Sequence, residues 1–313
     1  MKGFFVVRTF SVAALLAVLV FALLPVSSAS AAPVVCHDRY LSVSRYPGDS
    51  PHRVFGELCR PTRPTSSVQL LLHGATYNHT YWSAYARLAA ARGFATFNLD
   101  RLGYGRSDHP DPATLDLPAA GYVAHQVVDR LHRDGFRRVV LNAHSLGGLV
   151  AYEAARYGGV AAMIISGMPP GAPETRATAF PPFHPAEQDP KFAGRGWPAG
   201  YLTTMPDTRV DTFLYPGTYG PAVPRLEETV LKDTVPELEL AAIGTPPTPV
   251  DVPTLSVLGQ HDMFYCWETA DCTTAPAGQR VDAVIPNAGH SINVSKGAPV
   301  FYALTFDWLA EVS

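Results

Sequence analysis

Short apolar runs alternate with amphipathic stretches along most of the chain. The apolar runs have the length and β-branched content of buried strands, and apolar residues in the stretches between them recur at helical spacing. The predicted strands cover residues 68–72, 95–99, 139–142, 161–165, 254–258 and 281–285, and the predicted helices cover residues 81–91, 118–133, 146–157 and 300–312. This alternation predicts an α/β fold with a mostly parallel twisted sheet and helices on both faces.

Two segments depart from the alternation. Strand-like runs at residues 40–44 and 53–58 flank Pro47, Gly48 and Asp49, which predicts an amino-terminal β-hairpin. Residues 168–250 are rich in proline and aromatic residues and contain no run typical of a buried strand. Because a structureless loop of this length is uncommon inside a compact domain, we interpret the segment as an inserted cap over the carboxyl edge of the sheet. We expect residues 226–240 to contribute a helix to it, and residues 32–167 and 251–313 to form the core.

Aromatic residues of the predicted cap are candidates for the lining of a pocket. They are Phe180, Phe183, Trp197, Tyr201, Phe213, Tyr215 and Tyr219. Each is equally well explained as part of the cap's own core, so the sequence does not select among them.

The first residues have the pattern of an export signal. Lys2 and Arg8 precede apolar residues 12–24, which run into Pro25 and a series of small residues. This order predicts a secretory signal peptide, residues 1–31, cleaved after Ala31. The alternative, an uncleaved membrane anchor, usually needs about 20 apolar residues. We therefore expect a secreted extracellular protein with no stable membrane anchor after cleavage.

Composition and cysteine usage fit this interpretation. The 313 residues are 47% hydrophobic, and the formal net charge of −3 comes without a run of lysines or arginines, which argues against nucleic acid as a partner.

An even number of cysteines in an exported chain favours two disulfides. The hairpin sets Cys36 roughly opposite Cys59, and Cys266 and Cys272 would then close a short loop. The spacings C-x-x-C and H-E-x-x-H do not occur, so the sequence predicts no metal site. The oligomeric state stays open.

The strongest local signal surrounds Ser145. Residues 139–148, Val-Val-Leu-Asn-Ala-His-Ser-Leu-Gly-Gly, join a buried strand to a helix through a turn of small residues. The serine then lies at the positive end of a helix, where backbone N–H groups can stabilise an oxyanion. This stretch resembles the nucleophile turn of the α/β-hydrolase family, usually written G-x-S-x-G, with Ala143 where the first glycine is expected.

A second stretch strengthens the resemblance. The apolar strand at residues 70–72 ends in His73-Gly74-Ala75-Thr76, similar to the H-G turn that supplies an oxyanion donor in the family. The resemblance implies that the backbone N–H groups of Ala75 and Leu146 form the oxyanion hole, with Thr76 as the alternative to Ala75. Thr76 and His144 are also candidates for substrate binding.

A serine hydroxyl is a weak nucleophile without a base, and the base needs a carboxylate to orient it. In the α/β-hydrolase family both partners follow the serine, in the order acid and then histidine. Asp262 follows the predicted strand at residues 254–258, and His290 follows the strand at residues 281–285. Asp271 is the main rival for the acid. The resemblance therefore implies a serine hydrolase acting on a small-molecule or lipid-like ester, with no cofactor.

Three alternatives remain open on the sequence. A peptidase that releases amino-terminal residues would need acidic groups to hold an ammonium, and the predicted cap offers Glu187, Asp189, Glu227 and Glu228. A lactonase or a thioesterase is also possible, because analogy of fold does not separate these activities from an esterase. A secreted binding protein that kept the fold but lost catalysis is the third alternative.

Overall fold

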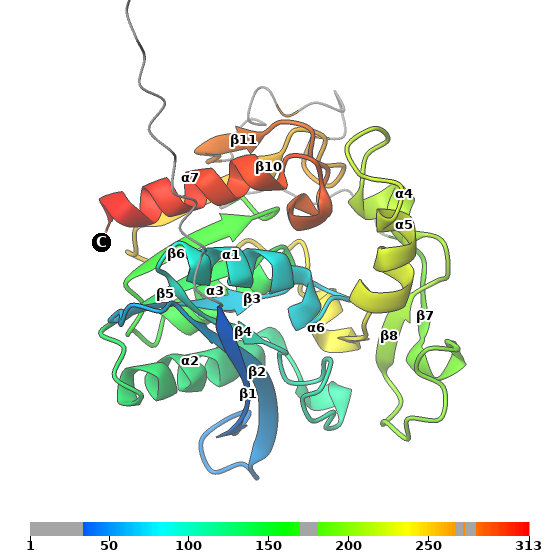
Figure 1. Ribbon diagram of the computed structural model, residues 1–313. Helices are drawn as coiled ribbons and strands as arrows, with labels where there is room; N and C mark the ends of the chain where they lie inside the picture. Colours follow the sequence, from blue (N-terminus) through cyan, green and yellow to red (C-terminus); the bar gives the residue numbers. More distant parts are fainter. Residues whose placement is uncertain (1–33, 170–180, 267–271, 273–279, 313) are drawn as a thin grey trace, which may run out of the picture. The chain divides into compact units, whose positions relative to one another are not determined.

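The computed structural model describes residues 34–169, 181–266, 272 and 280–312, all within the unit formed by residues 32–313 (Figure 1). The predicted signal peptide, Phe180 and Asp271 therefore lie outside the described residues. None of the described helices is long and apolar enough to cross a membrane.

Eight strands form the central sheet in the order β1-β2-β4-β3-β5-β6-β10-β11. They are β1 Val35–Val43, β2 His52–Arg60, β3 Ser67–Leu72, β4 Ala95–Leu99, β5 Arg138–His144, β6 Ala162–Ser166, β10 Thr254–Gly259 and β11 Ala283–Ile285. The pairs β1/β2 and β2/β4 are antiparallel, and all other neighbours are parallel. Every residue of β4 and β6 is buried, as expected for inner strands of a sheet that is covered on both faces. The predicted α/β fold is confirmed.

The helices cover both faces of this sheet and lie close to their predicted positions (Figure 1). They are α1 Ser83–Ala91, α2 Leu117–Arg133, α3 Leu146–Ala155 and α7 Ala298–Glu311, with short helices η1 His79–Trp82, η2 Pro112–Thr114 and η6 Ile292–Val294 in the loops. Helix α2 begins where the side chain of Asp116 accepts a hydrogen bond from the Ala119 N–H at 2.8 Å. Tyr85 of α1 packs against Phe306 of α7, with the ring centroids 5.5 Å apart.

The amino-terminal hairpin pairs its two halves in the predicted way. In the register of β1 and β2, Cys36 lies opposite Cys59, and the two form a disulfide across a Cα–Cα distance of 4.0 Å. Cys266 and Cys272 form the second disulfide. Both pairings that the sequence suggested are present in the structure.

Residues 181–250 form a second, smaller sheet and several short helices beside the central sheet (Figure 1). The sheet has the order β7-β8-β9. Its strands are β7 Phe183–Pro185, β8 Tyr201–Thr204 and β9 Val235–Pro236, and the helices are η4 Ala186–Gln188, α4 Arg209–Phe213, α5 Val223–Leu226, η5 Glu227–Leu231 and α6 Glu237–Ala241.

Two expectations for this segment were wrong. The helix expected over residues 226–240 ends at Leu231 and resumes at Glu237, because β9 pairs with β8 between them and Pro236 has no N–H for a helical hydrogen bond. The segment also contains a buried strand, since three of the four residues of β8 are buried. With two threonines in four residues, β8 is too short and too polar to stand out as an apolar run. That residues 168–250 act as a separate cap stays a prediction.

Removal of the hairpin disulfide tests its contribution to stability. We expect Cys36→Ala/Cys59→Ala to lower the free energy of unfolding by about 3 kcal/mol, because a cross-link over 23 residues restricts the unfolded chain. The matched variant Cys266→Ala/Cys272→Ala opens a link over only 6 residues and should lose less stability. Denaturant unfolding of both variants measures the difference. An equal or reversed ranking would contradict the expectation.

Candidate active site

Ser145 lies at the junction between β5 and α3 in a conformation that non-glycine residues rarely adopt, with φ 52° and ψ −126°. Its N–H donates to the carbonyl of Ser166, the last residue of β6, at 2.8 Å. On the other side, a Cβ atom on Gly147 would lie only 2.5 Å from the His73 carbonyl oxygen, so α3 begins pressed against the end of β3. Contacts with both neighbouring strands therefore hold the strained serine in place.

A continuous series of hydrogen bonds links Ser145, His290 and Asp262. His290 Nε2 lies 2.9 Å from Ser145 Oγ, and His290 Nδ1 lies 2.9 Å from Asp262 Oδ2. With the proton assigned to Nδ1, which faces the Asp262 carboxylate, Nε2 is the nitrogen that can accept the serine O–H. His290 is 3% exposed and Asp262 is fully buried. The structure thus brings together the three side chains that the sequence singled out.

The loop after β10 fixes the position of Asp262. Its other carboxylate oxygen accepts the Phe264 N–H at 3.0 Å, and its carbonyl accepts the Cys266 N–H at 2.8 Å. Cys266 is in turn bonded to Cys272. The carboxylate is therefore held by a tight turn next to a disulfide, which limits the positions that its oxygens can take.

The ring of His144 packs against the ring of His290. Its ring is fully buried, stacks on Tyr81 at 4.8 Å and lies 4.8 Å from the His290 ring. Its Nδ1 lies 3.1 Å from Ser166 Oγ. Burial lowers the pKa of His144 well below its usual value, and the neighbouring His290 lowers it further. A neutral imidazole thus packs against the His290 ring and places no positive charge beside it.

A narrow pocket lies at Ser145, with a cavity volume of about 20 Å³. Its lining consists of Ala75, Tyr77, Ser145, Phe183, Phe213, Ile243, Phe264, Tyr265 and His290. Both tyrosine hydroxyls have partners elsewhere, because Tyr77 bonds to Glu227 and Ser291 and Tyr265 bonds to Met168. None of the described lining residues carries an acid or a permanent charge. The surface around Ser145 Oγ is therefore apolar and aromatic.

The other residues predicted for this site lie around the pocket rather than in it. Ala75 lines it, and Leu146 follows the serine as the first residue of α3. Thr76 and His144 are fully buried and are not among the lining residues, so this geometry does not support a direct substrate contact for either.

Four of the aromatic residues predicted to line a pocket are found in two different pockets. Phe183 and Phe213 line the pocket at Ser145, whereas Trp197 and Tyr201 line a different one. Tyr215 instead stacks on His261 at 4.1 Å. The lining residues that sequence reasoning missed are Tyr77, Ile243, Phe264 and Tyr265. Three of them had a usable signal, because Tyr77 follows the H-G-A-T stretch and Phe264 and Tyr265 follow the candidate acid.

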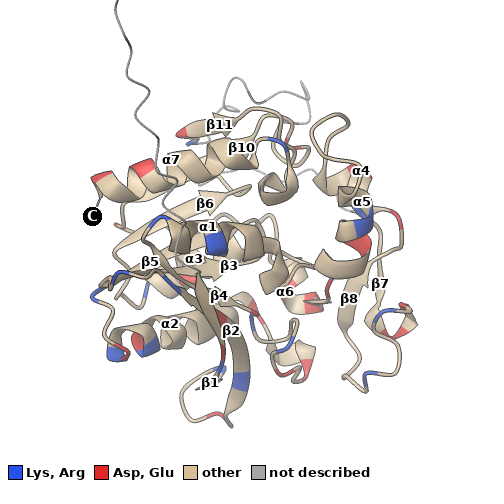
Figure 2. Ribbon diagram, in the orientation of Figure 1, with Lys and Arg blue, Asp and Glu red and all other residues tan. Residues whose placement is uncertain are grey.

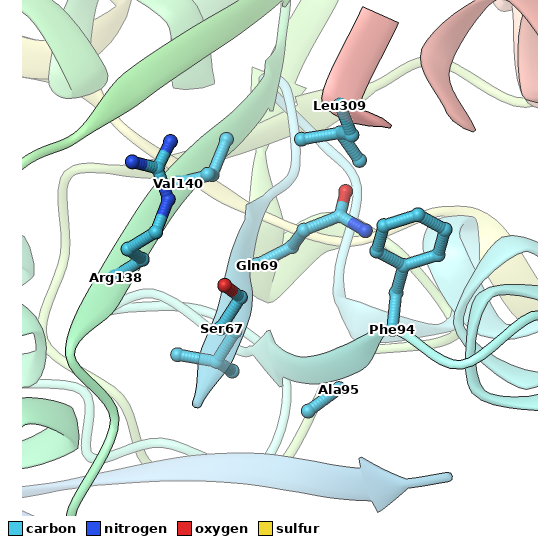
Figure 3. A pocket seen from close by; sticks show the side chains of 8 residues that line it. Ser67, Gln69, Phe94, Ala95, Arg138, Val140 and Leu309 are labelled. Atoms are coloured by element: carbon cyan, nitrogen blue, oxygen red, sulfur yellow. The ribbon is translucent and has the colours of Figure 1, made fainter. Parts of the chain in front are cut away.

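A further pocket lies at the amino ends of the central strands, away from Ser145 (Figure 3). Ser67, Ala95 and Arg138, which line it, begin β3, β4 and β5, whereas Ser145 follows the end of β5. No histidine or acid is among its lining residues. Its serine therefore lacks the base that nucleophilic chemistry needs.

The described residues contain one group with metal-ligand spacing, formed by Cys36, Glu57 and Cys59. Both cysteines are bonded to each other. Their sulfurs are therefore not the free thiolates that bind metal ions.

A parallel sheet whose central strand delivers a serine into a strained turn defines the α/β-hydrolase architecture. The chain belongs to this family, because the model of the alpha/beta hydrolase family matches residues 69–303. A search of curated proteins finds no match.

Among solved structures, the chain is similar to a thermophilic esterase from Thermogutta terrifontis, with 21% identity over 88% of this chain and 99% of that chain and a TM-score of 0.62. It is similar to the N-acyl homoserine lactonase AidH, with 17% identity, 88% and 98% coverage and a TM-score of 0.57. It also resembles the epoxide hydrolase VrEH1 from Vigna radiata, with 15% identity, 88% and 98% coverage and a TM-score of 0.53. At these identities the likeness shows the fold alone.

Gly167 offers a test of how closely the two histidines are packed. It has a φ of +63°, and a Cβ atom there would lie 2.9 Å from His144 Cε1 and 3.0 Å from His290 Cε1. We expect Gly167→Ala to displace His290 and to lower kcat for a small ester by about tenfold or more, since displacements near 1 Å at a reacting group are costly.

The matched control is Gly48→Ala, at a φ of +86° in the hairpin with no atom within 4 Å of the added Cβ. Both variants should lose about 1 kcal/mol of stability from the positive φ, but the control should keep its kcat. Steady-state kinetics and thermal unfolding separate the two effects. Equal kcat values for the two variants would contradict the packing argument.

Proposed function

We propose that this hydrolase is a serine esterase that works through an acyl-enzyme intermediate. The observation that carries the proposal is the hydrogen-bonded series from Asp262 through His290 to Ser145, ending at an apolar pocket. In the first step His290 Nε2 takes the hydroxyl proton as Ser145 Oγ attacks the ester carbonyl. Asp262 stabilises the imidazolium, and the N–H groups of Ala75 and Leu146 bind the oxyanion. The alcohol leaves with the proton from His290.

In the second step His290 removes a proton from water, which attacks the acylated serine and releases the acid.

This chemistry distinguishes acyl transfer from epoxide opening. A serine oxygen that opened an epoxide would be left in an ether, which water does not hydrolyse, whereas an acylated serine is an ester. A serine nucleophile therefore favours esters, lactones and thioesters over epoxides as substrates.

The pocket lining supports an uncharged substrate with an apolar or aromatic acyl group. Phe183, Phe213 and Phe264 form much of the wall, and the nearby tyrosine hydroxyls already have partners. Burial of a charged group against such a wall without a partner is unfavourable. We infer that neutral carboxylic esters are preferred over charged ones.

The acidic residues considered for an amino-terminal peptidase have other partners. Figure 2 shows acidic and basic segments side by side among residues 181–250. Glu227 pairs with Arg209 at 2.9 Å, Asp189 with Lys232 at 2.8 Å, and Glu228 with Lys232 at 3.5 Å. Glu187 lines the pocket of Trp197 rather than the pocket of Ser145. None of the four is positioned to hold a substrate ammonium beside the serine, which argues against the peptidase.

We also propose that the mature chain is secreted after cleavage following Ala31, and that residues 168–250 form a cap over the pocket. Two disulfides support exposure to an oxidising compartment. The position of Phe183 and Phe213 in the pocket wall supports the cap.

Replacement of the serine tests the proposed nucleophile. Ser145→Ala should lower kcat for a p-nitrophenyl ester by at least about 10⁴-fold, because loss of the nucleophile removes the covalent step. The control Ser295→Ala removes another buried hydroxyl, which bonds to the Ser291 carbonyl, and should retain turnover. Unchanged turnover in Ser145→Ala would remove this serine from the mechanism.

A substrate panel tests the inferred preference. Neutral esters of graded acyl length should be hydrolysed with a higher kcat/KM than esters that carry a charged acyl group, since the pocket offers no counter-charge. Lactones and thioesters of matched size belong in the same panel, with aminoacyl-naphthylamides as the peptidase arm. Faster turnover of the naphthylamides would overturn the esterase assignment in favour of the peptidase.

A further inference from the structure

The loop that follows β3 contains a second strained residue, Thr76. It has a φ of 54°, a region that is unfavourable for a β-branched side chain. The residue is fully buried, and its neighbour Ala75 lines the pocket beside Ser145. The dihedral angles of Thr76 determine the direction in which the chain leaves Ala75, so a fixed Thr76 constrains the path of the loop that carries the Ala75 N–H.

Residues 181–250 hold this loop in place. Arg209 Nη1 donates to Thr76 Oγ1 at 2.8 Å, and the Asp233 N–H donates to the Thr76 carbonyl at 2.8 Å. Two residues further along the chain, Asn78 Nδ2 donates to Asp233 Oδ2 at 2.8 Å. Both the side chain and the carbonyl of the strained residue are therefore bonded to the insertion.

Arg209 is an unusual anchor because its side chain is fully buried. Its guanidinium lies 2.9 Å from Glu227, which also accepts the Tyr77 hydroxyl at 3.0 Å. The guanidinium carbon lies 4.5 Å from the centre of the Tyr77 ring and 4.9 Å from that of Phe213, and both rings line the pocket. A buried ion pair of this kind is weak evidence for a stabilising role, since desolvation offsets most of its attraction. The contacts of Arg209 with Thr76, Tyr77 and Phe213 instead limit the orientations that these side chains can take.

We propose that Arg209 is a positioning residue for acyl transfer, which through Thr76 Oγ1 holds the loop after β3 in the conformation that directs its N–H toward the oxyanion. The proposal rests on the proposed function, because it concerns the oxyanion that Ser145 would form. Arg209 does not act as a direct binder of a substrate carboxylate, since it is fully buried and is not among the residues that line the pocket. Catalysis by the core then depends on the docked position of residues 181–250.

Three variants at one position test the proposal. Thr76→Val keeps the branched shape and the strain but loses the hydroxyl, so kcat should fall by about tenfold or more with KM little changed. Thr76→Ser keeps the hydroxyl and should restore most of kcat. Thr76→Gly has no hydroxyl but adopts a positive φ without strain, so its kcat should exceed that of Thr76→Val.

This ranking separates positioning from packing. If Thr76 only filled space, glycine would leave the larger cavity and would be the worse variant. The control Thr212→Val removes another buried hydroxyl, which bonds within the segment of Arg209 to the Thr208 carbonyl, and it should keep the wild-type kcat. Thermal unfolding of each variant identifies the temperature range in which all are folded.

A second substitution keeps the test decisive if Thr76→Val does not fold. Arg209→Lys retains a positive charge opposite Glu227 but lacks the guanidinium fork, and it should lower kcat while KM stays nearly constant. A normal kcat in Thr76→Val or Arg209→Lys, or a rise in KM alone, would overturn the positioning role. Wild-type turnover that disappears in Ser145→Ala would still support the esterase in that case, so the two proposals fail separately.

Discussion

The proposed chemistry depends on one backbone conformation, the positive φ of Ser145 between β5 and α3. Such a conformation costs about 1–3 kcal/mol and persists only where the surroundings over-determine it. Here the hydrogen bond to Ser166 and the close approach of Gly147 to the His73 carbonyl supply that constraint. Because α3 is pressed against the end of β3, the serine hydroxyl lies at the carboxyl ends of the strands. The loops that follow β10 and β11 lie at the same ends.

The parallel sheet brings the remaining groups to the same edge. Asp262 and His290 follow β10 and β11, and the carboxyl ends of parallel strands meet on one side of the sheet. Residues 181–250 complete this edge in two ways: Phe183 and Phe213 form part of the pocket wall, and Arg209 anchors the loop of Thr76. In the proposed mechanism the core thus supplies the reactive groups, and residues 181–250 supply part of the apolar wall and contacts that hold the loop of Thr76.

The predictability of each part follows from the range of the interactions that determine it. The buried strands of the core were predicted within a few residues because short runs of mostly apolar residues encode them, and the motif around Ser145 is local in sequence. The β7-β8-β9 sheet was missed because its strands have two to four residues and take their register from tertiary contacts. The role proposed for Arg209 has no sequence signal, since its partners Thr76 and Glu227 are joined to it only by folding.

The central claim is that Ser145 is a nucleophile activated by His290, and covalent labelling tests it most directly. The purified mature chain should react with a fluorophosphonate, and peptide mass spectrometry should locate a single adduct on Ser145. The same treatment of His290→Ala should give little or no adduct, because the serine then lacks its base. An adduct on another residue, or equal labelling of Ser145 without His290, would contradict the account.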